Sequence, residues 1–268
     1  MYTFSHFFPA VAVACAGAAL CAGCSTQHSG VSDTADARHL LGVTRTRILI
    51  DNRYDAQPDA QAAAFLRPYS QKVDSLMSPV VGQTARYMAS FRPESPLSNL
   101  LADILVWSAG RFGEQPDFAV YNMGGIRAAL AKGDVTVGDV LDVAPFENKI
   151  CFLTLSGEKV QELFGQMARR YGEAVSHSVR LEIGRDSTLL SATVGGQPVD
   201  PKRQYRVATL DYLAQGNDQL VAFKAKTQVV QPQGSENNVR NLIMDYFRSA
   251  AAKGLTVDCE VEGRIAVK

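Results

Sequence analysis

The strongest pattern of apolar and polar positions lies over residues 94–110, which read ESPLSNLLADILVWSAG. Apolar residues recur there at the spacing of one helix face, at positions 97, 100, 101, 104 and 105. Ser95 is typical of an N-cap, Pro96 of a first helical turn and Gly110 of a helix end. The pattern therefore predicts a helix over this stretch.

Weaker periodicity and short apolar runs predict the remaining elements. Helices are expected over residues 59–77, with Pro68 as a site for a kink, 158–172 and 236–252. Strands are expected over residues 45–51, 117–121, 149–155, 178–183, 189–194, 204–213 and 255–265. Helices and strands alternate irregularly and hairpins come late, which predicts an α+β domain, a mixed β-sheet with flanking helices, rather than a doubly wound fold.

The first residues have the pattern of an export signal. The uncharged apolar run FFPAVAVACAGAALCAGC ends at Cys24, with small residues before it. Its ending resembles a bacterial lipobox, which predicts a signal peptide over residues 1–23 and a lipid on Cys24 that anchors the protein to a membrane. An uncleaved single-pass anchor is the alternative. Either one places the body of the protein outside the cytoplasm, behind a polar tether over residues 24–44.

Charge bears on the kind of partner to expect, and cysteine content bears on whether a disulfide can form. The chain has 27 basic and 27 acidic residues, so no net field favours nucleic acid as a partner. Cys151 and Cys259 lie in strand-like runs of a chain expected in a compartment that permits disulfides. Sequence does not show their distance, so a bridge and two free thiols both remain open.

Residues for catalysis are scarce. Of the four histidines, only His177 lies in the main part of the chain. Beyond the export signal, whose ending CAGC is the one CxxC of the sequence, there is no HExxH, no CxxC pair, no G-x-S-x-G elbow and no GxxxxGK[ST] loop. The sequence therefore predicts no catalytic residue, no metal site and no cofactor in this chain.

A glycine-containing loop is the first candidate for ligand binding. The residues NMGGIR, 122–127, follow a strand-like run. Gly124 and Gly125 would let backbone N–H groups approach a ligand, and Arg127 offers a planar fork of donors. The simpler interpretation is a tight turn capped by polar residues.

Two further loops carry aromatic and polar residues. PFEN places Phe146 two positions before Asn148, and YLAQGND places Tyr212 six positions before Asp218. Two aromatic rings on loops can enclose a flat base, and a carboxylate can accept hydrogen bonds from two ribose hydroxyls. Taken singly, each aromatic could instead belong to the core and the aspartate to a turn.

Together these motifs resemble the C-terminal domain of 5'-nucleotidases and UDP-sugar hydrolases. The resemblance rests on NMGGIR, PFEN, YLAQGND and the terminal VEGRI, with RPESPLSNLLADIL as the opening helix and VVGQT as the entry. It runs from about residue 58 to the C-terminus. In that family this domain binds the nucleoside part of the substrate, while a separate N-terminal metallophosphoesterase domain holds two divalent metals and cleaves the phosphoester.

The resemblance implies a role for each site residue. Phe146 and Tyr212 would stack on the base, Asp218 would bind the ribose hydroxyls and Asn122 would contact the base. Tyr212 stands where phenylalanine is usual, so its ring face and not its hydroxyl is expected to be used.

Basic and small residues complete the expected site. Arg127 would contact the sugar or the phosphate. Arg92 resembles the family arginine before the opening helix, although it lies two residues before the glutamate where the family has three. Gly124, Gly125 and Asn148 would line the same site.

Two functions follow from this organisation. Residues 45–79 would form a strand and an interdomain-type helix, and residues 80–268 the substrate-binding domain. In the first hypothesis the chain supplies nucleotide binding to a separate metallophosphoesterase, with any metals in that partner. In the second it is a stand-alone extracytoplasmic protein that binds nucleosides or nucleotides. An exposed apolar face on the 59–77 helix would favour the first hypothesis.

Overall fold

The computed structural model of the chain describes residues 47, 49, 51–54 and 59–268. The predicted signal peptide, Cys24 and the tether lie outside this part. The chain divides into two units, Met1–Asp59 and Ala60–Lys268. In the first, Asn52–Tyr54 forms a single 3₁₀ turn. The strand expected over residues 45–51 is not formed at Arg47, Leu49 or Asp51, the only residues of that stretch that are described.

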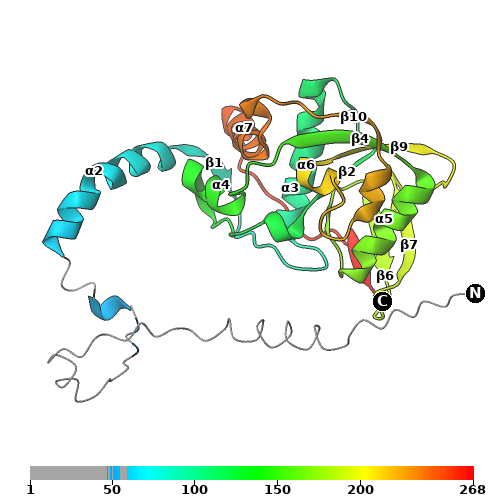
Figure 1. Ribbon diagram of the computed structural model, residues 1–268, viewed down its shortest axis with the longest axis horizontal. Coiled ribbons are helices and arrows are strands. Elements are labelled where there is room, and N and C mark those ends of the chain that lie inside the picture. The colour runs from blue at the N-terminus through cyan, green and yellow to red at the C-terminus, as the bar shows by residue number, and fades with distance from the viewer. Residues whose placement is uncertain (1–46, 48, 50, 55–58) are drawn as a thin grey trace, which may run out of the picture. The chain divides into compact units, whose positions relative to one another are not determined.

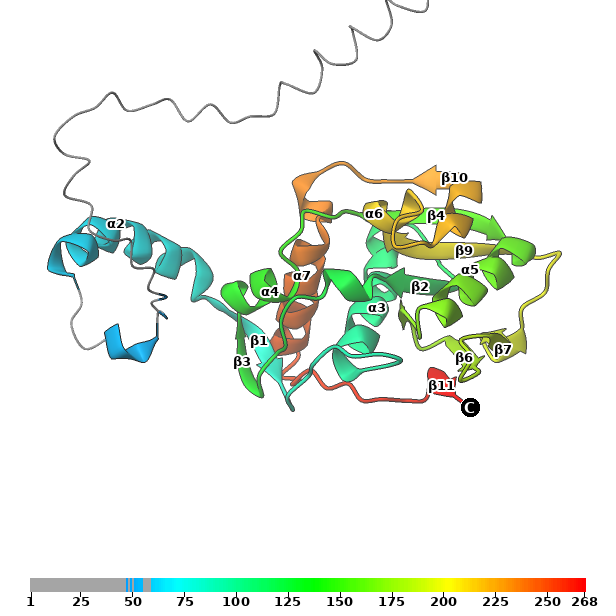
Figure 2. The ribbon, with the colours of Figure 1, turned by 60° about the horizontal axis from the view of Figure 1, so that its bottom comes forward.

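A five-stranded sheet forms the centre of the second unit (Figure 2). Its order is β10 (Thr227–Val230), β4 (Ile150–Ser156), β9 (Gln204–Leu210), β2 (Phe118–Tyr121) and β5 (Ala174–Val175). Strands β4 and β9 pair antiparallel from Ile150↔Leu210 to Ser156↔Gln204. Strand β2 runs parallel to β9. The sheet is mixed, as the sequence predicts.

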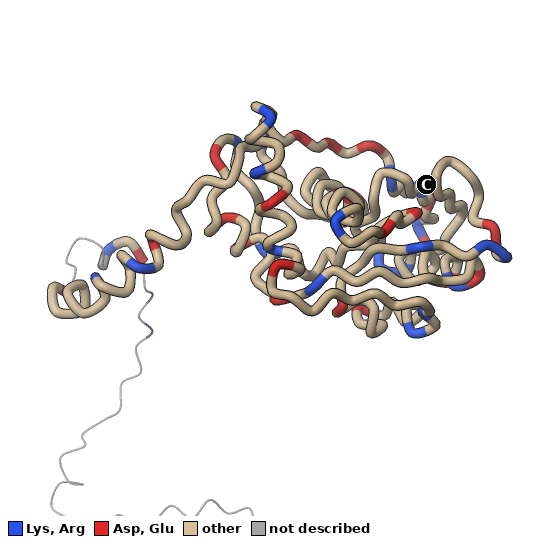
Figure 3. Tube along the Cα trace, turned by 90° about the horizontal axis from the view of Figure 1, so that it is seen from above, with Lys and Arg blue, Asp and Glu red and all other residues tan. Residues whose placement is uncertain are grey.

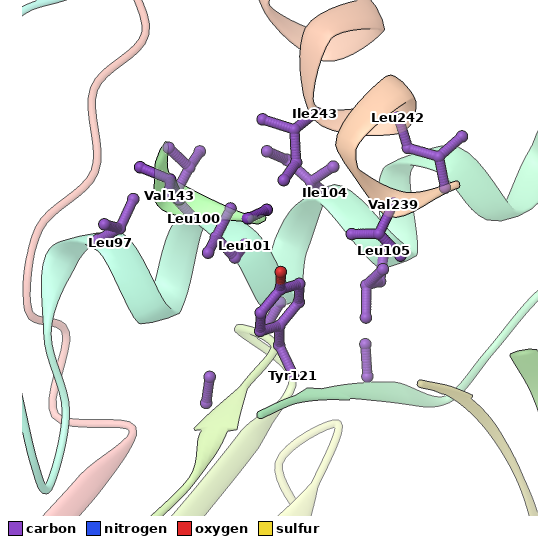
Figure 4. Packing of buried hydrophobic residues seen from close by; sticks show 14 of the residues in the cluster. Leu97, Leu100, Leu101, Ile104, Leu105, Tyr121, Val143, Val239, Leu242 and Ile243 are labelled. Atoms are coloured by element: carbon purple, nitrogen blue, oxygen red, sulfur yellow. The ribbon is translucent and has the colours of Figure 1, made fainter. Parts of the chain in front are cut away.

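Helices α3 (Pro96–Ala109), α4 (Val137–Val143) and α7 (Val239–Ala252) share one hydrophobic cluster with one face of this sheet. In Figure 4, Tyr121 points from β2 toward the leucines of α3 and the first turns of α7. On the other face, α5 (Gly157–Arg169) packs with a second cluster. Successive β2 residues alternate between the two clusters, with Phe118 and Val120 on the α5 side. Both faces of the sheet are therefore buried, and ligands must reach its edges.

Two smaller sheets flank the centre (Figure 1). Strands β1 (Val80–Thr84) and β3 (Gly133–Thr136) pair antiparallel. The four-stranded sheet has the order β11 (Ile265–Val267), β6 (Val179–Ile183), β7 (Leu189–Val194) and β8 (Gln197–Pro198). Several inner residues of β6 and β7 belong to the α5-side cluster. The helices and mixed sheets together make an α+β domain.

Helix α3 begins as its sequence predicts. The Ser95 hydroxyl accepts the Ser98 N–H, the Ser98 hydroxyl accepts the Ser95 N–H, and Pro96 occupies the first turn. The α-helix ends at Ala109 with Gly110 as its C-cap, so the predicted start and the predicted end are both confirmed. A 3₁₀ turn over Gly110–Phe112 follows, and Gly113, with a left-handed φ of 69°, closes it.

Other boundaries also differ from the sequence-based expectations. The strand expected over residues 204–213 ends at Leu210, where a helical turn, α6 (Asp211–Ala214), takes over. Helix α7 begins at Val239 rather than at residue 236, because Asn238 caps it after a 3₁₀ turn. Of the strand expected over residues 255–265, only Ile265 belongs to one. Tyr212 is therefore on a turn and not on a strand.

Helix α2 (Ala60–Met77) is continuous through Pro68 and buries none of its residues. Five of its large apolar side chains are more than half exposed, at positions 65, 66, 69, 73 and 76, whereas Met77 at its end is partly buried. Like the rest of the domain, it carries charges of both signs, with Arg67, Lys72 and Asp74 on this helix (Figure 3). Within the described part of the chain, no helix is both long enough and apolar enough to cross a membrane.

Candidate functional site

Three segments meet at one edge of the central sheet. Strands β2 and β9 run parallel, so the residues that follow Tyr121 and Leu210 leave the sheet at the same edge. Strand β4 runs antiparallel to β9, so the residues that precede Ile150 reach this edge as well. Sheet topology alone thus brings together loops that are far apart in the sequence.

These segments enclose a cavity of about 220 Å³. Its lining residues are Asn122, Gly124, Gly125, Phe146, Asn148, Tyr212 and Asp218. All seven were singled out from the sequence as candidate binding residues. Among the described residues, four larger depressions of about 320 to 400 Å³ are lined without a Phe, Tyr or Trp side chain.

The two aromatic rings of the cavity are not part of the core. Phe146 is 50% exposed and Tyr212 is 37% exposed, whereas the core residues Phe118, Phe152 and Phe164 are 0% exposed. Leaving two large rings in contact with water has no benefit for folding. The simpler interpretation of these residues, as core or buried-strand positions, is therefore wrong.

A hydrogen-bonded group of three polar side chains lies on the cavity wall. Asn122 Nδ2 donates to Asp218 Oδ2 at 2.5 Å, and the Tyr212 hydroxyl donates to Asp218 Oδ1 at 3.1 Å. Burial, followed by the charge of Asp218 and this hydrogen bond, raises the pKa of Tyr212. The hydroxyl therefore stays protonated at neutral pH. The carboxylate has an anchor on each of its oxygens.

Asn122 is held in a tight position beside the glycines. It is 5% exposed, and its Oδ1 is buried with no hydrogen-bond partner. A Cβ at Gly125 would lie 2.0 Å from this Oδ1, so a side chain there would displace the amide. Gly124 is open by comparison, because its nearest neighbours would be 3.8 Å from a Cβ.

Arg92 and Arg127, also predicted site residues, do not line the cavity. The Arg127 guanidinium is exposed and donates to the Gly124 carbonyl at 3.3 Å. Arg92 instead donates to Glu173 at 2.6 Å, and its Nη1 is buried without a partner.

Glu173 is a site residue that sequence reasoning missed. Its carboxylate is fully buried and accepts from Arg92 Nη2 at 2.6 Å and Arg170 Nε at 2.9 Å. Its other oxygen accepts the Met123 N–H at 2.8 Å, which ties the glycine loop to both arginines. The signal in the sequence was an acidic residue entering an apolar strand, GEAV.

The terminal VEGRI motif and the two thiols do not line the cavity. Arg264 of VEGRI is 0% exposed and pairs through two nitrogens with Asp103, at 3.0 and 2.7 Å. Cys151 and Cys259 are free thiols. Over the described ranges, no three His, Cys, Asp or Glu side chains gather in a group that could hold a metal ion.

A cavity at a sheet edge, lined by aromatic rings and a carboxylate, is typical of domains that bind small molecules. Residues 80–225, more than half of the chain, match the family described as "5'-nucleotidase, C-terminal domain". The chain belongs to this family.

Individual relatives agree with this assignment. The chain is 29% identical over 195 residues to the endonuclease YhcR of Bacillus subtilis, covering 68% of this chain and 15% of that protein. It is 27% identical over 161 residues to protein UshA of Escherichia coli, covering 59% of this chain and 29% of that one. The structure of a 5'-nucleotidase precursor from Thermus thermophilus superimposes with a TM-score of 0.68 at 27% identity, over 80% of this chain and 44% of that chain. The chain thus spans less than half the length of each of these relatives.

Proposed function

We propose that the cavity binds the nucleoside part of a nucleotide and that the chain acts in nucleotide catabolism. The observation that carries this proposal is the pair of exposed rings, Phe146 and Tyr212, which line one cavity together with Asp218. Aromatic faces bind any base by stacking, and a carboxylate accepts hydroxyl donors. Membership of the 5'-nucleotidase C-terminal domain family supports the same substrate class.

The size of the cavity fits part of a substrate rather than all of it. At about 220 Å³ it is smaller than the roughly 300–1,000 Å³ typical of pockets for drug-sized ligands. A base and its sugar would be held there, and a phosphate would extend toward the edge. Arg127 donates to the carbonyl of the lining residue Gly124, and Arg92 is linked through Glu173 to the Met123 N–H of the same loop. These two arginines remain the proposed contacts for that end of the ligand.

Hydrolysis, in this proposal, belongs to a separate metallophosphoesterase that supplies two divalent metals. The support is helix α2, which presents Phe65, Tyr69 and Val73 at 68%, 60% and 53% exposure on an 18-residue helix with no buried residue. Contiguous exposed apolar side chains of this kind mark protein–protein contact sites. A metallophosphoesterase that docks on α2 would cover these side chains.

The proposed location is outside the cytoplasm, with the protein held on a membrane by a lipid on Cys24. The support is the sequence before Cys24, an apolar run followed by small residues. Cys24→Ala removes the thiol to which the lipid is attached, so the variant is expected in the soluble fraction or unprocessed. Fractionation with mass spectrometry of the N-terminus tests this, and a processed variant that stays with membranes would exclude the lipid anchor.

Nucleoside binding is tested by titration calorimetry on the purified protein. Stacking contributes about 1–3 kcal/mol per base, so Phe146→Ala should weaken nucleoside binding by roughly five- to 150-fold. Phe65→Ala is the matched control, since it removes an exposed ring that does not line the cavity. No binding of any nucleoside by the wild type at millimolar concentration would refute the proposal.

Docking is tested with a purified two-metal phosphoesterase that lacks this C-terminal domain. Mixtures are examined by size-exclusion chromatography and by nucleotide hydrolysis, with Phe65→Asp/Val73→Asp as the docking variant. Leu190→Asp on β7, where the side chain is 56% exposed, is the control for added surface charge. A complex that forms with the wild type and with Leu190→Asp, but not with the α2 variant, supports docking of the phosphoesterase on α2. Nucleoside binding without any complex would favour a stand-alone binding protein.

A further inference from the structure

Tyr212 makes a contact that its ring face does not require. Its hydroxyl donates to Asp218 Oδ1 at 3.1 Å, whereas the sequence assigns that hydroxyl no role. We propose that Tyr212 is a specificity-determining residue: its hydroxyl holds the Asp218 carboxylate in the orientation that accepts two neighbouring hydroxyls of a ribose. This inference rests on the proposed function, because it concerns the same cavity.

The backbone around Asp218 explains why its carboxylate needs anchors. Asp218 and the next residue, Gln219, both have left-handed backbone, with φ of 54° and 62°, and Gly216 has φ of 83°. Left-handed conformations are unfavourable for residues with a Cβ and persist only where other contacts hold them. The Asn217 side chain closes this turn by donating to the Tyr212 carbonyl at 2.8 Å. Tyr212 therefore holds the turn through its main chain and the carboxylate through its hydroxyl.

Counting acceptor positions shows what the anchors leave free. An ionised carboxylate has about four lone-pair positions, two on each oxygen. Asn122 occupies one on Oδ2 and Tyr212 occupies one on Oδ1. One position remains on each oxygen, which matches two hydroxyl donors on adjacent carbons. A ligand with a single hydroxyl would leave one position unused.

A phenylalanine at this position would keep the stacking face and lose this arrangement. The carboxylate would then be held by Asn122 alone and could rotate. Its two remaining acceptors would no longer be fixed toward the sugar. The loss should fall on ligands that use both acceptors, and much less on ligands that use one.

The test measures Tyr212→Phe and the wild type by calorimetry with one ribonucleoside and its 2'-deoxy and 3'-deoxy analogues. The matched control is Tyr171→Phe, which removes a hydroxyl that donates to the Arg185 carbonyl at 2.7 Å on a comparably exposed tyrosine. In Tyr212→Phe the ribo-to-deoxyribo affinity ratio should fall about three- to tenfold, with deoxynucleoside affinity changed less than about twofold. In Tyr171→Phe both should equal the wild type.

The outcomes separate this inference from the function on which it rests. A wild type that binds no nucleoside overturns both. Nucleoside binding with an unchanged affinity ratio in Tyr212→Phe overturns the role of the hydroxyl and leaves the proposed function standing. An equal loss for all three ligands also overturns it, because that result reports damage to the cavity rather than to the diol contact. Melting temperatures of the variants identify such damage directly.

Discussion

Replacing Glu173 by glutamine should destabilise the fold strongly, although the two side chains have the same shape. The buried carboxylate accepts from Arg92 and Arg170 on one oxygen and from the Met123 N–H on the other. A glutamine amide can be turned either way, and in each orientation its NH₂ group faces a donor. One side of this contact is therefore lost in every case.

The magnitude follows from the burial of the group. Removing one partner of a buried ion pair typically costs about 3–5 kcal/mol. Here Arg92 and Arg170 keep 29% and 22% of their side chains exposed, so water partly compensates both of them. A loss of about 2–4 kcal/mol is expected, which lowers the melting temperature of a domain of this size by about 4–15 °C.

Thermal unfolding followed by circular dichroism measures this effect. Glu162→Gln is the control, since Glu162 pairs with Lys159 at 2.7 Å with 39% of its side chain exposed. Surface pairs of this kind contribute about 0–1 kcal/mol, so this variant should melt within about 4 °C of the wild type. If Glu173→Gln melts no lower than Glu162→Gln, the buried carboxylate does not hold the glycine loop and the reasoning fails.

The remaining predictions concern the glycine loop and the thiols. Gly125→Ala should cost about 1–3 kcal/mol by urea unfolding, because its Cβ would lie 2.0 Å from Asn122 Oδ1. Gly124→Ala, with contacts at 3.8 Å, should change stability by less than about 1 kcal/mol, and equal costs would contradict the steric argument. Burial raises the pKa of the Cys151 and Cys259 thiols to about 11, so at pH 8 only about 0.1% of each is thiolate. Alkylation of both, mapped by mass spectrometry, should be slow until the protein is denatured; rapid native labelling of buried Cys151 would contradict this.

Local signals in the sequence were sufficient for several elements. The apolar spacing and the Ser95 cap predicted the start of α3, and the short apolar run before Asn122 predicted β2. These succeed because a helix face or a buried strand is encoded within a few residues of itself. The three motifs singled out from the sequence, NMGGIR, PFEN and YLAQGND, contain all seven residues that line the cavity.

Long-range contacts decided the rest. The sequence pattern over residues 204–213 predicts one strand, but β9 ends at Leu210 because its pairing with β4 ends at Ile150. Tyr212 lies on the helical turn that follows, and its hydroxyl donates to Asp218. The last expected strand forms only at Ile265–Val267, where β11 finds a partner in β6.

The chain alone determined which residue types stand on the loops, and the tertiary structure decided which of them meet. Asn122 and Asp218 are 96 positions apart and become hydrogen-bonded neighbours because β2 and β9 are parallel neighbours in the sheet. Arg92 was expected at the site and instead pairs with Glu173, whose own position depends on β5 pairing with β2. Side-chain chemistry is local to the sequence, whereas strand pairing is a property of the whole chain, and it is strand pairing that assembles the cavity.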